Sequence, residues 1–211
     1  MKLRRFRSKQ THKSQSLVEL AIVLPILILL MSGVIEFGNL LNQYINLVDG
    51  AREGARFGSD KDPFIRPADG SAFSSNADFY NGIDTIVEGT FSGGTQLTKG
   101  AISPISLNKD NGDDVVISVF SILNGTVKRF PYSTGWSKYS KQTSRFTDAE
   151  LAARLDATAP DTGMLLVEIF YNYSQILKMP FFTVFIPDPI SVHTYSIMPL
   201  TAAEPTPTPK P

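Results

Sequence analysis

The chain has 211 residues, 20 basic and 20 acidic side chains, and no cysteine. The lack of cysteine excludes disulfides, thiol chemistry and thiolate metal sites. The balanced charge hides an asymmetry, because six of the basic residues lie within the first 13 positions, where there is no acid. The remainder holds 14 basic residues against 20 acids.

Residues 1–14 form a basic leader in front of a long apolar segment. Lysine and arginine next to a membrane-spanning helix stay on the cytoplasmic side and interact there with anionic lipid. This topology explains the basic cluster, so we expect no nucleic-acid partner. It also predicts a cytoplasmic N-terminus and an extracytoplasmic remainder.

The segment Leu17–Phe37 predicts a single helix that spans a lipid bilayer. Leu20–Ile35 contains no charged residue, and only Glu19 and Glu36 interrupt the wider segment, one near each end. About twenty residues at 1.5 Å rise each match the roughly 30 Å of bilayer hydrocarbon. A buried core helix and a cleaved secretory signal are the competing interpretations.

Helical periodicity continues beyond the apolar segment, which argues against a cleaved signal. Apolar residues recur there at spacings of three and four, namely Phe37, Leu40, Leu41, Tyr44, Ile45, Val48, Ala51 and Ala55. This pattern places them on one helical face. We therefore predict that residues 15–58 form the membrane helix and its extracytoplasmic extension.

Small residues form a ridge on this extension. Gly50, Gly54 and Gly58 recur every four residues, with Ala51 and Ala55 beside them. Such a surface allows another backbone to approach closely, either this protein's own sheet or a neighbouring helix. Gly58 alternatively ends the helix.

Two residues inside the apolar segment have consequences of their own. Pro25 lacks the N–H that would bond to the carbonyl of Ala21, so we expect a kink there. Glu19 lies at the edge of the hydrocarbon, where a carboxylate needs a polar partner or water. Either its side chain reaches the lipid headgroups or it has a functional role.

Residues 59–200 are long enough to form a compact head. Val115–Leu123 and Leu165–Tyr173 predict strands, and Ser191–Met198 is a weaker candidate. A capping-box pattern beginning at Thr147 predicts a short helix. We expect Asp84–Phe91 to form a short helix or strand.

Connections of hairpin length between these strands predict an antiparallel sheet laid against the long helix, an α+β fold. Lys61–Asn81 reads as a loop. The Asn-Gly pair within Asn108–Asp114 suits a hairpin turn, with calcium binding as a minor alternative. Met179–Pro187 is an aromatic connection, either core filling or an exposed patch. Residues 201–211 are a Pro/Thr-rich tail that cannot pack a core.

Catalytic motifs do not stand out. His193 has no partner histidine or cysteine for zinc, and a structural role is expected for it. Asp113 and Asp114 are adjacent and would point to opposite faces of a strand. We expect a protein without a metal, cofactor or enzymatic activity.

Three runs in order carry a family resemblance. Ser14–Pro25 reads SQSLVELAIVLP, Gly33–Gly38 reads GVIEFG, and Ala51–Arg56 reads AREGAR. Together they resemble the TadE-like family of minor pilins or pseudopilins of the tight-adherence (Flp, type IVb) pilus. The resemblance covers about a quarter of the chain. It implies a pilin-like extracytoplasmic head on a protein that is anchored in the bacterial cytoplasmic membrane or incorporated into a surface pilus.

The resemblance implies roles for individual residues. A prepilin peptidase would cut between Ser14 and Gln15, which makes Glu19 the fifth residue of the mature chain. Glu19 would then neutralise the new α-amino group of a neighbouring subunit, with Leu20 and Pro25 in the same assembly segment. The partners would be the peptidase, other pilins and the pilus assembly platform.

Two further hypotheses compete with this assembly role. The head could be a permanently membrane-tethered extracytoplasmic binding module, which would retain its leader. An anchored hydrolase ranks third, because it requires a catalytic constellation assembled from distant loops.

Overall fold

A computed structural model describes residues 13–65, 74–91, 105–123, 126–155, 163–179, 183–184 and 186–200. Most of the basic leader and the whole Pro/Thr-rich tail lie outside these residues, as do Phe181, Phe182 and Phe185. The chain divides into two compact units, residues 1–39 and 40–211, which are described separately.

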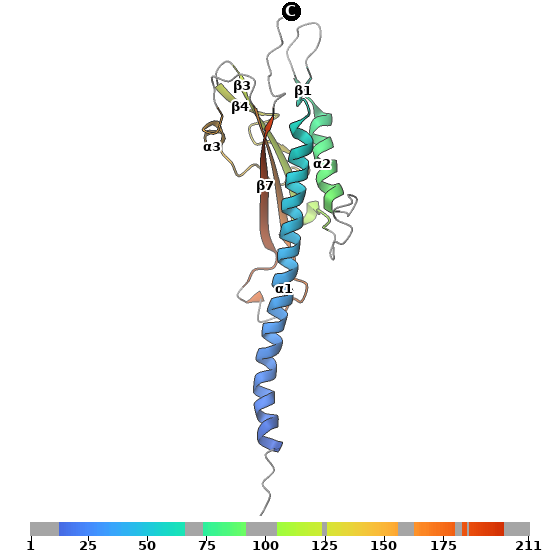
Figure 1. Cartoon of the computed structure of the whole chain (residues 1–211), viewed down its shortest axis with the longest axis vertical. Coiled ribbons are helices and arrows are strands. Elements are labelled where there is room, and N and C mark those ends of the chain that lie inside the picture. Colours follow the sequence, from blue (N-terminus) through green and yellow to red (C-terminus); the bar gives the residue numbers. More distant parts are fainter. Residues whose placement is uncertain are drawn as a thin grey trace, which may run out of the picture. The chain divides into compact units, whose positions relative to one another are not determined.

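One helix begins the described chain. Helix α1 runs over Lys13–Ser59, 47 residues, and Pro25 lies inside it without ending it (Figure 1). The predicted continuous helix is confirmed. Its last twenty residues belong to the compact unit of the head rather than to the anchor.

The head contains an antiparallel sheet, which confirms the predicted α+β class. Its strands are β3 (Asp114–Leu123), β4 (Thr126–Phe130), β5 (Trp136–Ser137), β6 (Gly163–Tyr173) and β7 (Ile190–Leu200). The order is β4-β3-β6-β7, and β5 pairs with β3. A separate pair joins β1 (Phe64–Ile65) to β2 (Ser74–Ser75).

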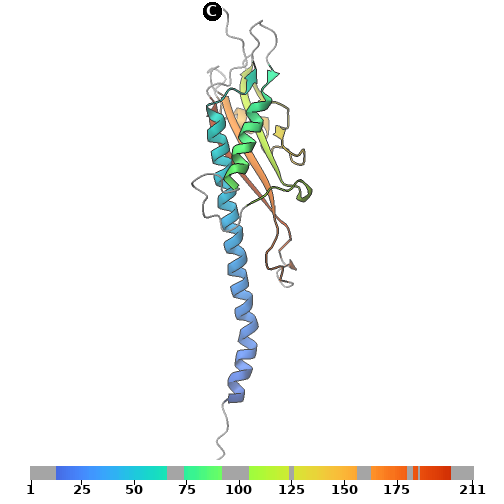
Figure 2. The same ribbon diagram turned by 90° about the vertical axis from the view of Figure 1, so that its right-hand side faces the viewer.

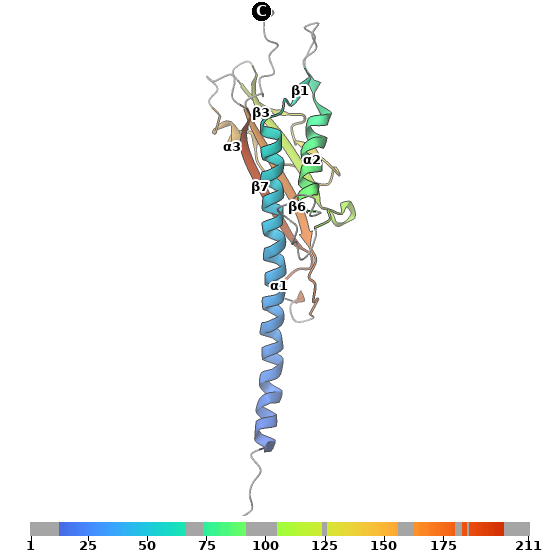
Figure 3. The same ribbon diagram turned by 45° about the vertical axis from the view of Figure 1, so that its right-hand side comes forward.

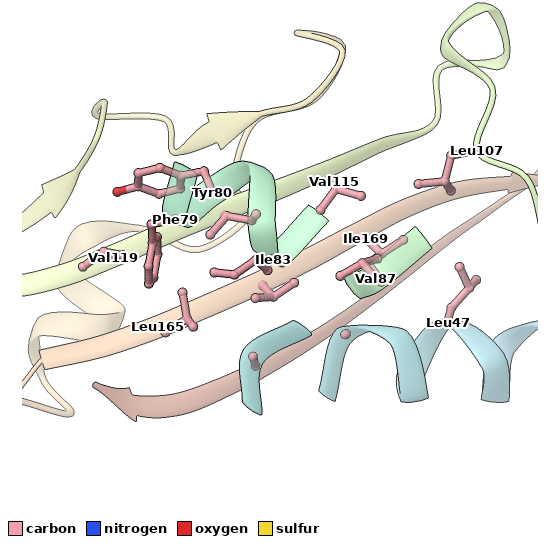
Figure 4. Close-up of a cluster of buried hydrophobic side chains, with 14 of the residues drawn as sticks. Leu47, Phe79, Tyr80, Ile83, Val87, Leu107, Val115, Val119, Leu165 and Ile169 are labelled. Carbon is pink, nitrogen blue, oxygen red and sulfur yellow. The ribbon is translucent and has the colours of Figure 1, made fainter. Parts of the chain in front are cut away.

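The sheet is covered on both faces. Helix α2 (Ala77–Phe91) lies beside the C-terminal part of α1 on one face (Figures 2 and 3). The main core lies between these helices and the alternate β6 residues Leu165, Val167 and Ile169 (Figure 4). The intervening residues Met164 and Leu166 join a second buried cluster with Leu151 of helix α3 (Asp148–Ala152).

Helix α2 resolves one open prediction and corrects another. Asp84–Phe91 is helical, and its buried apolar residues follow helical spacing. The prediction of a loop over Lys61–Asn81 is wrong in part, because β1, β2 and the start of α2 lie there. The Oδ1 of Asn76 accepts the Asp78 N–H at 3.1 Å and turns the chain into the helix.

The turn at Asn108–Asp114 is not a hairpin. Lys109–Asn111 form a 3₁₀ helix, η1, and Gly112 ends it with φ of 81°. The glycine therefore serves as a left-handed cap at the entrance to β3. The capping box of α3 is confirmed, because Thr147 and Glu150 exchange both of its hydrogen bonds.

Candidate functional site

Most side chains of the apolar part of α1 are exposed. The exposed large apolar residues of this part are Leu17, Val18, Leu20, Ile22, Val23, Leu24, Ile26, Leu27, Ile28, Leu29, Leu30, Met31, Val34, Ile35 and Phe37. Water would disfavour so much contiguous apolar surface. The helix is long and apolar enough to cross a membrane.

The predicted assembly and cleavage residues all lie near the start of α1. Ser14 and Gln15 fall in its first turn, immediately after Lys13. Glu19, Leu20 and Pro25 are exposed along the next three turns. Their roles in cleavage and assembly stay predictions.

The glycine ridge packs inside this protein's own head. A Cβ added to Gly50 would lie 2.4 Å from Phe91 Cε1, and one on Gly54 would lie 2.5 Å from Val87 Cγ2. One on Gly58 would lie 2.5 Å from Leu165 Cδ2. Ala51 and Ala55 are fully buried in the same core.

This packing decides between the two partners left open for the ridge. Helix α2 and strand β6 of this chain occupy it, so the ridge packs on its own sheet and on a neighbouring helix of the same head. Gly58 does not end the helix either, because α1 continues to Ser59 and Gly58 is packed against Leu165. The absent side chains allow α1 and α2 to approach closely.

A different face of α1 stays uncovered within the head. Leu41, Tyr44 and Ile45 are between 45 and 50% exposed, at spacings of three and four. They form one apolar stripe on the helix. This stripe is available to another helix.

A charged cluster joins α2 to the sheet. Lys138 Nζ lies 2.6 Å from Asp84 Oδ2 and 2.7 Å from Glu88 Oε1. Burial disfavours the charged lysine, but its hydrogen bonds to Asp84 and Glu88 outweigh this effect and raise the pKa of Lys138. An ammonium group held protonated in this way is a structural cation rather than a nucleophile.

The adjacent acids Asp113 and Asp114 contact different parts of the head. Asp113 accepts backbone N–H bonds from Asn108 and Asn172 at 2.9 and 2.8 Å. Burial nevertheless raises the pKa of Asp113. Asp114 instead accepts hydrogen bonds from Ser137 of β5 and from Tyr139, which follows that strand.

Metal binding finds no support in these acids. Both carboxylates already accept backbone N–H groups, which orients their oxygens toward protein donors. Within the described ranges, no group of three or more histidine, cysteine or acidic side chains is placed to hold a metal ion.

His193 has a partner that the sequence analysis missed. Its Nε2 lies 3.0 Å from Glu168 Oε1, and Glu168 is fully buried. The same oxygen accepts the Arg145 N–H at 3.0 Å. The pair joins β6, β7 and the segment before α3, which agrees with a structural histidine.

Only the strand register brings Glu168 and His193 together. Phe170 pairs with His193 and Glu168 with Tyr195, so the acid and the histidine are diagonal neighbours. An acid within an otherwise apolar strand is the signal that would have suggested a buried partner.

A shallow pocket of about 390 Å³ lies in the segment after β4. Its walls include Tyr132, Trp136, Lys141 and Gln142, and no acid or histidine lines it.

Comparison with known protein families gives a match that lies within helix α1. Residues 15–56 match the family model described as TadE-like protein, which confirms the resemblance over this segment and relates the chain to components of the tight-adherence pilus. The match lies within α1 and ends before the rest of the head. No curated protein and no solved structure matches this chain.

Proposed function

We propose that this protein is a minor pilin or pseudopilin, a non-enzymatic assembly component of a tight-adherence type IVb pilus or related secretion system. The observation that carries this proposal is α1 itself. Its TadE-like segment is exposed and apolar at one end and forms part of the head's core at the other. A helix of this kind holds a soluble head on a membrane and can pack laterally against equivalent helices.

The orientation follows from charge. The basic leader stays in the cytoplasm, and the head lies outside the bacterial cytoplasmic membrane. The helix spans the membrane once. The partners are the lipid bilayer, a prepilin peptidase, other pilins and the assembly platform.

Leader removal is the first step that this function requires. The peptidase cuts between Ser14 and Gln15, and Gln15 becomes the new N-terminus. The intact mass of protein recovered from its native membrane tests this step. A mass lacking residues 1–14 supports the pilin function, whereas a full-length mass favours the permanently tethered binding module.

Glu19 supplies the charge for assembly. A freed α-amino group is a cation at neutral pH, and a carboxylate stabilises it in surroundings of low dielectric constant. Glu19 is exposed on α1, four residues after Gln15. Leu20 and Pro25 follow on the same exposed segment, and the stripe of Leu41, Tyr44 and Ile45 extends the surface for helix packing.

A pair of substitutions tests the role of Glu19. Glu19→Gln keeps the size of the side chain but removes its charge, so pilus assembly should fall sharply while the amount of membrane-inserted protein stays unchanged. Glu36→Gln removes a charge at the other end of the apolar segment and should leave assembly intact. Normal assembly with Glu19→Gln would show that this charge has no role.

A further inference from the structure

The pocket in the head is built from one short segment, residues 132–143, which includes strand β5. Its volume of about 390 Å³ lies within the range of roughly 300–1,000 Å³ that is usual for small-molecule sites. The rings of Tyr132 and Trp136 line it, together with serine and threonine hydroxyl groups and the side chains of Lys141 and Gln142. The pocket therefore combines ring surfaces with hydrogen-bonding groups.

Hydrogen bonds fix the shape of this segment. The Ser144 N–H donates to the Thr134 carbonyl at 3.1 Å and closes the segment into a loop. Asp114 is fully buried and accepts the N–H groups of Lys141 and Gln142, both at 2.8 Å. Because the wall is already ordered, a ligand does not have to order it, which lowers the entropic cost of binding.

The two rings are held in different ways. Trp136 is half-buried and stacks on Tyr80 of α2, with ring centroids 6.1 Å apart and an interplanar angle of 21°. Tyr132 is 64% exposed. Trp136 is thus a fixed part of the wall, whereas Tyr132 offers a ring that a ligand reaches from solvent. Aromatic rings next to polar groups suit a ligand that has both an apolar face and polar edges.

Ser140 adds an unusual backbone conformation to the wall. Its φ is 56°, in the left-handed region that residues other than glycine rarely adopt. Asp114 holds the N–H groups of the two residues that follow, so the surrounding contacts impose this conformation. Backbone of this kind gathers at binding sites, where it places the wall in advance of the ligand.

Charge and hydrogen-bonding capacity narrow the class of ligand. Among the described residues that line the pocket, Lys141 carries the one charge, and it is exposed. The Gln142 side chain donates an N–H to the Gly112 carbonyl at 3.1 Å, which orients its amide and makes its Oε1 an acceptor for hydroxyl donors. A matching ligand has an anionic group for Lys141, hydroxyl groups for the polar side chains and an apolar face for the rings.

We propose that this pocket binds an acidic sugar residue, whose ring carries a carboxylate as in a uronic acid. The C–H groups on one face of the sugar pack against Tyr132, and the sugar hydroxyl groups exchange hydrogen bonds with Gln142 and the serine and threonine side chains. The carboxylate pairs with Lys141. This inference concerns the head alone and depends on neither leader removal nor assembly into a pilus.

Binding of trigalacturonate, an oligosaccharide of uronic acid residues, tests the proposal. The full-length protein is kept in a zwitterionic detergent without a sugar headgroup, and saturation-transfer NMR follows a titration of the ligand. We expect trigalacturonate to bind several-fold more tightly than its methyl ester, which keeps the ring faces but lacks the charges. Inorganic phosphate at the same concentration should not displace it, because phosphate offers no apolar face to the rings.

Two variants show whether the ligand occupies the pocket. Lys141→Gln removes the cation and Tyr132→Ala removes the exposed ring, so each should weaken trigalacturonate binding several-fold. The matched controls are Lys128→Gln on β4 and Tyr44→Ala on α1, exposed positions that do not line the pocket. Both controls should bind as the unsubstituted protein does. Thermal midpoints close to that of the unsubstituted protein establish that each variant is folded.

The other outcomes overturn the proposal. No detectable binding would show that the pocket does not take an acidic sugar, and equal binding of the methyl ester would refute the contact between the carboxylate and Lys141. Displacement by inorganic phosphate would identify a simple anion site. Unchanged binding in both Lys141→Gln and Tyr132→Ala would place the sugar elsewhere on the protein. None of these results bears on the pilin function, which the intact mass tests separately.

Discussion

Asp114 shows how one side chain organises a large part of the head. It is fully buried and accepts five hydrogen bonds. Val115 and Tyr139 donate backbone N–H groups to Oδ1, at 2.9 and 3.0 Å. The other oxygen accepts the Ser137 hydroxyl at 2.6 Å and the N–H groups of Lys141 and Gln142, both at 2.8 Å. A carboxylate thus fixes a segment that has little regular structure of its own.

Asp114→Asn should destabilise the head by roughly 2–5 kcal/mol, because the isosteric amide places an NH₂ group against two or three donors in either orientation. Asp110→Asn, on an exposed position of η1, should change stability by less than about 0.5 kcal/mol. Thermal unfolding of the full-length protein in detergent, followed by near-ultraviolet circular dichroism, measures both. Equal midpoints for the two variants would show that Asp114 is dispensable.

Tyr80 gives the head a dependence on alkaline pH. Its ring is buried between Phe79 and Trp136, and burial raises the pKa of the Tyr80 hydroxyl well above its ordinary value. Below the unfolded pKa of about 10 both states keep the proton. As the pH rises above this value the unfolded chain alone ionises, so the free energy of unfolding falls.

Tyr80→Phe should make the free energy of unfolding fall less steeply with pH. Above pH 10 the slope should be smaller by up to about 1.4 kcal/mol per pH unit. Tyr132→Phe removes an exposed tyrosine and should leave the decline unchanged. Thermal midpoints between pH 7 and 11 provide the comparison. If the thermal midpoint of Tyr80→Phe falls with pH as steeply as that of the unsubstituted protein, the buried hydroxyl does not cause the loss of stability at alkaline pH.

At the scale of elements, the packing of α1 against α2 depends on the absence of side chains. Gly54 faces Val87, a β-branched residue with one preferred rotamer in a helix. The closest atom, Val87 Cγ2, therefore cannot rotate away from an added methyl group. The two helices would have to separate instead.

Gly54→Ala should lower stability by about 1–3 kcal/mol through overpacking, although alanine favours a helix over glycine. Gly89→Ala is the matched control on α2, because an added Cβ meets nothing within 4 Å there. That substitution should raise stability by up to about 1 kcal/mol. The free energy of unfolding of both variants is measured by urea unfolding. Similar increases for Gly54→Ala and Gly89→Ala would contradict close packing at Gly54.

At the scale of the whole molecule, one helix serves two surroundings. Its first part is apolar and exposed, whereas Leu47, Ala51 and Ala55 are fully buried among the strands and α2 of the head. The head therefore includes the end of α1 as a structural element. An anchor removed at the wrong position would take part of the core with it.

A chain that begins at Leu40 should fold, with a cooperative thermal transition and a near-ultraviolet circular dichroism signal. A chain that begins at Asp60 should lose both, because deleting α1 exposes α2 and one face of the sheet. Cooperative unfolding of the shorter chain would show that α1 is not part of the core.

The sequence predicted those features that depend on neighbours close along the chain. Helix α1, the α3 capping box, β3 and β6 follow from local periodicity and local hydrogen bonds, and the structure contains all four. The charge asymmetry and the TadE-like runs likewise need no tertiary information. They were enough to propose a membrane-anchored assembly protein.

Tertiary structure alone decided what these elements contact. The partner of Gly54, the pairing of Glu168 with His193 and four of the five donors around Asp114 join residues far apart in sequence. Strand register and helix direction fix these contacts, because a shift of one residue in register would turn each side chain to the opposite face.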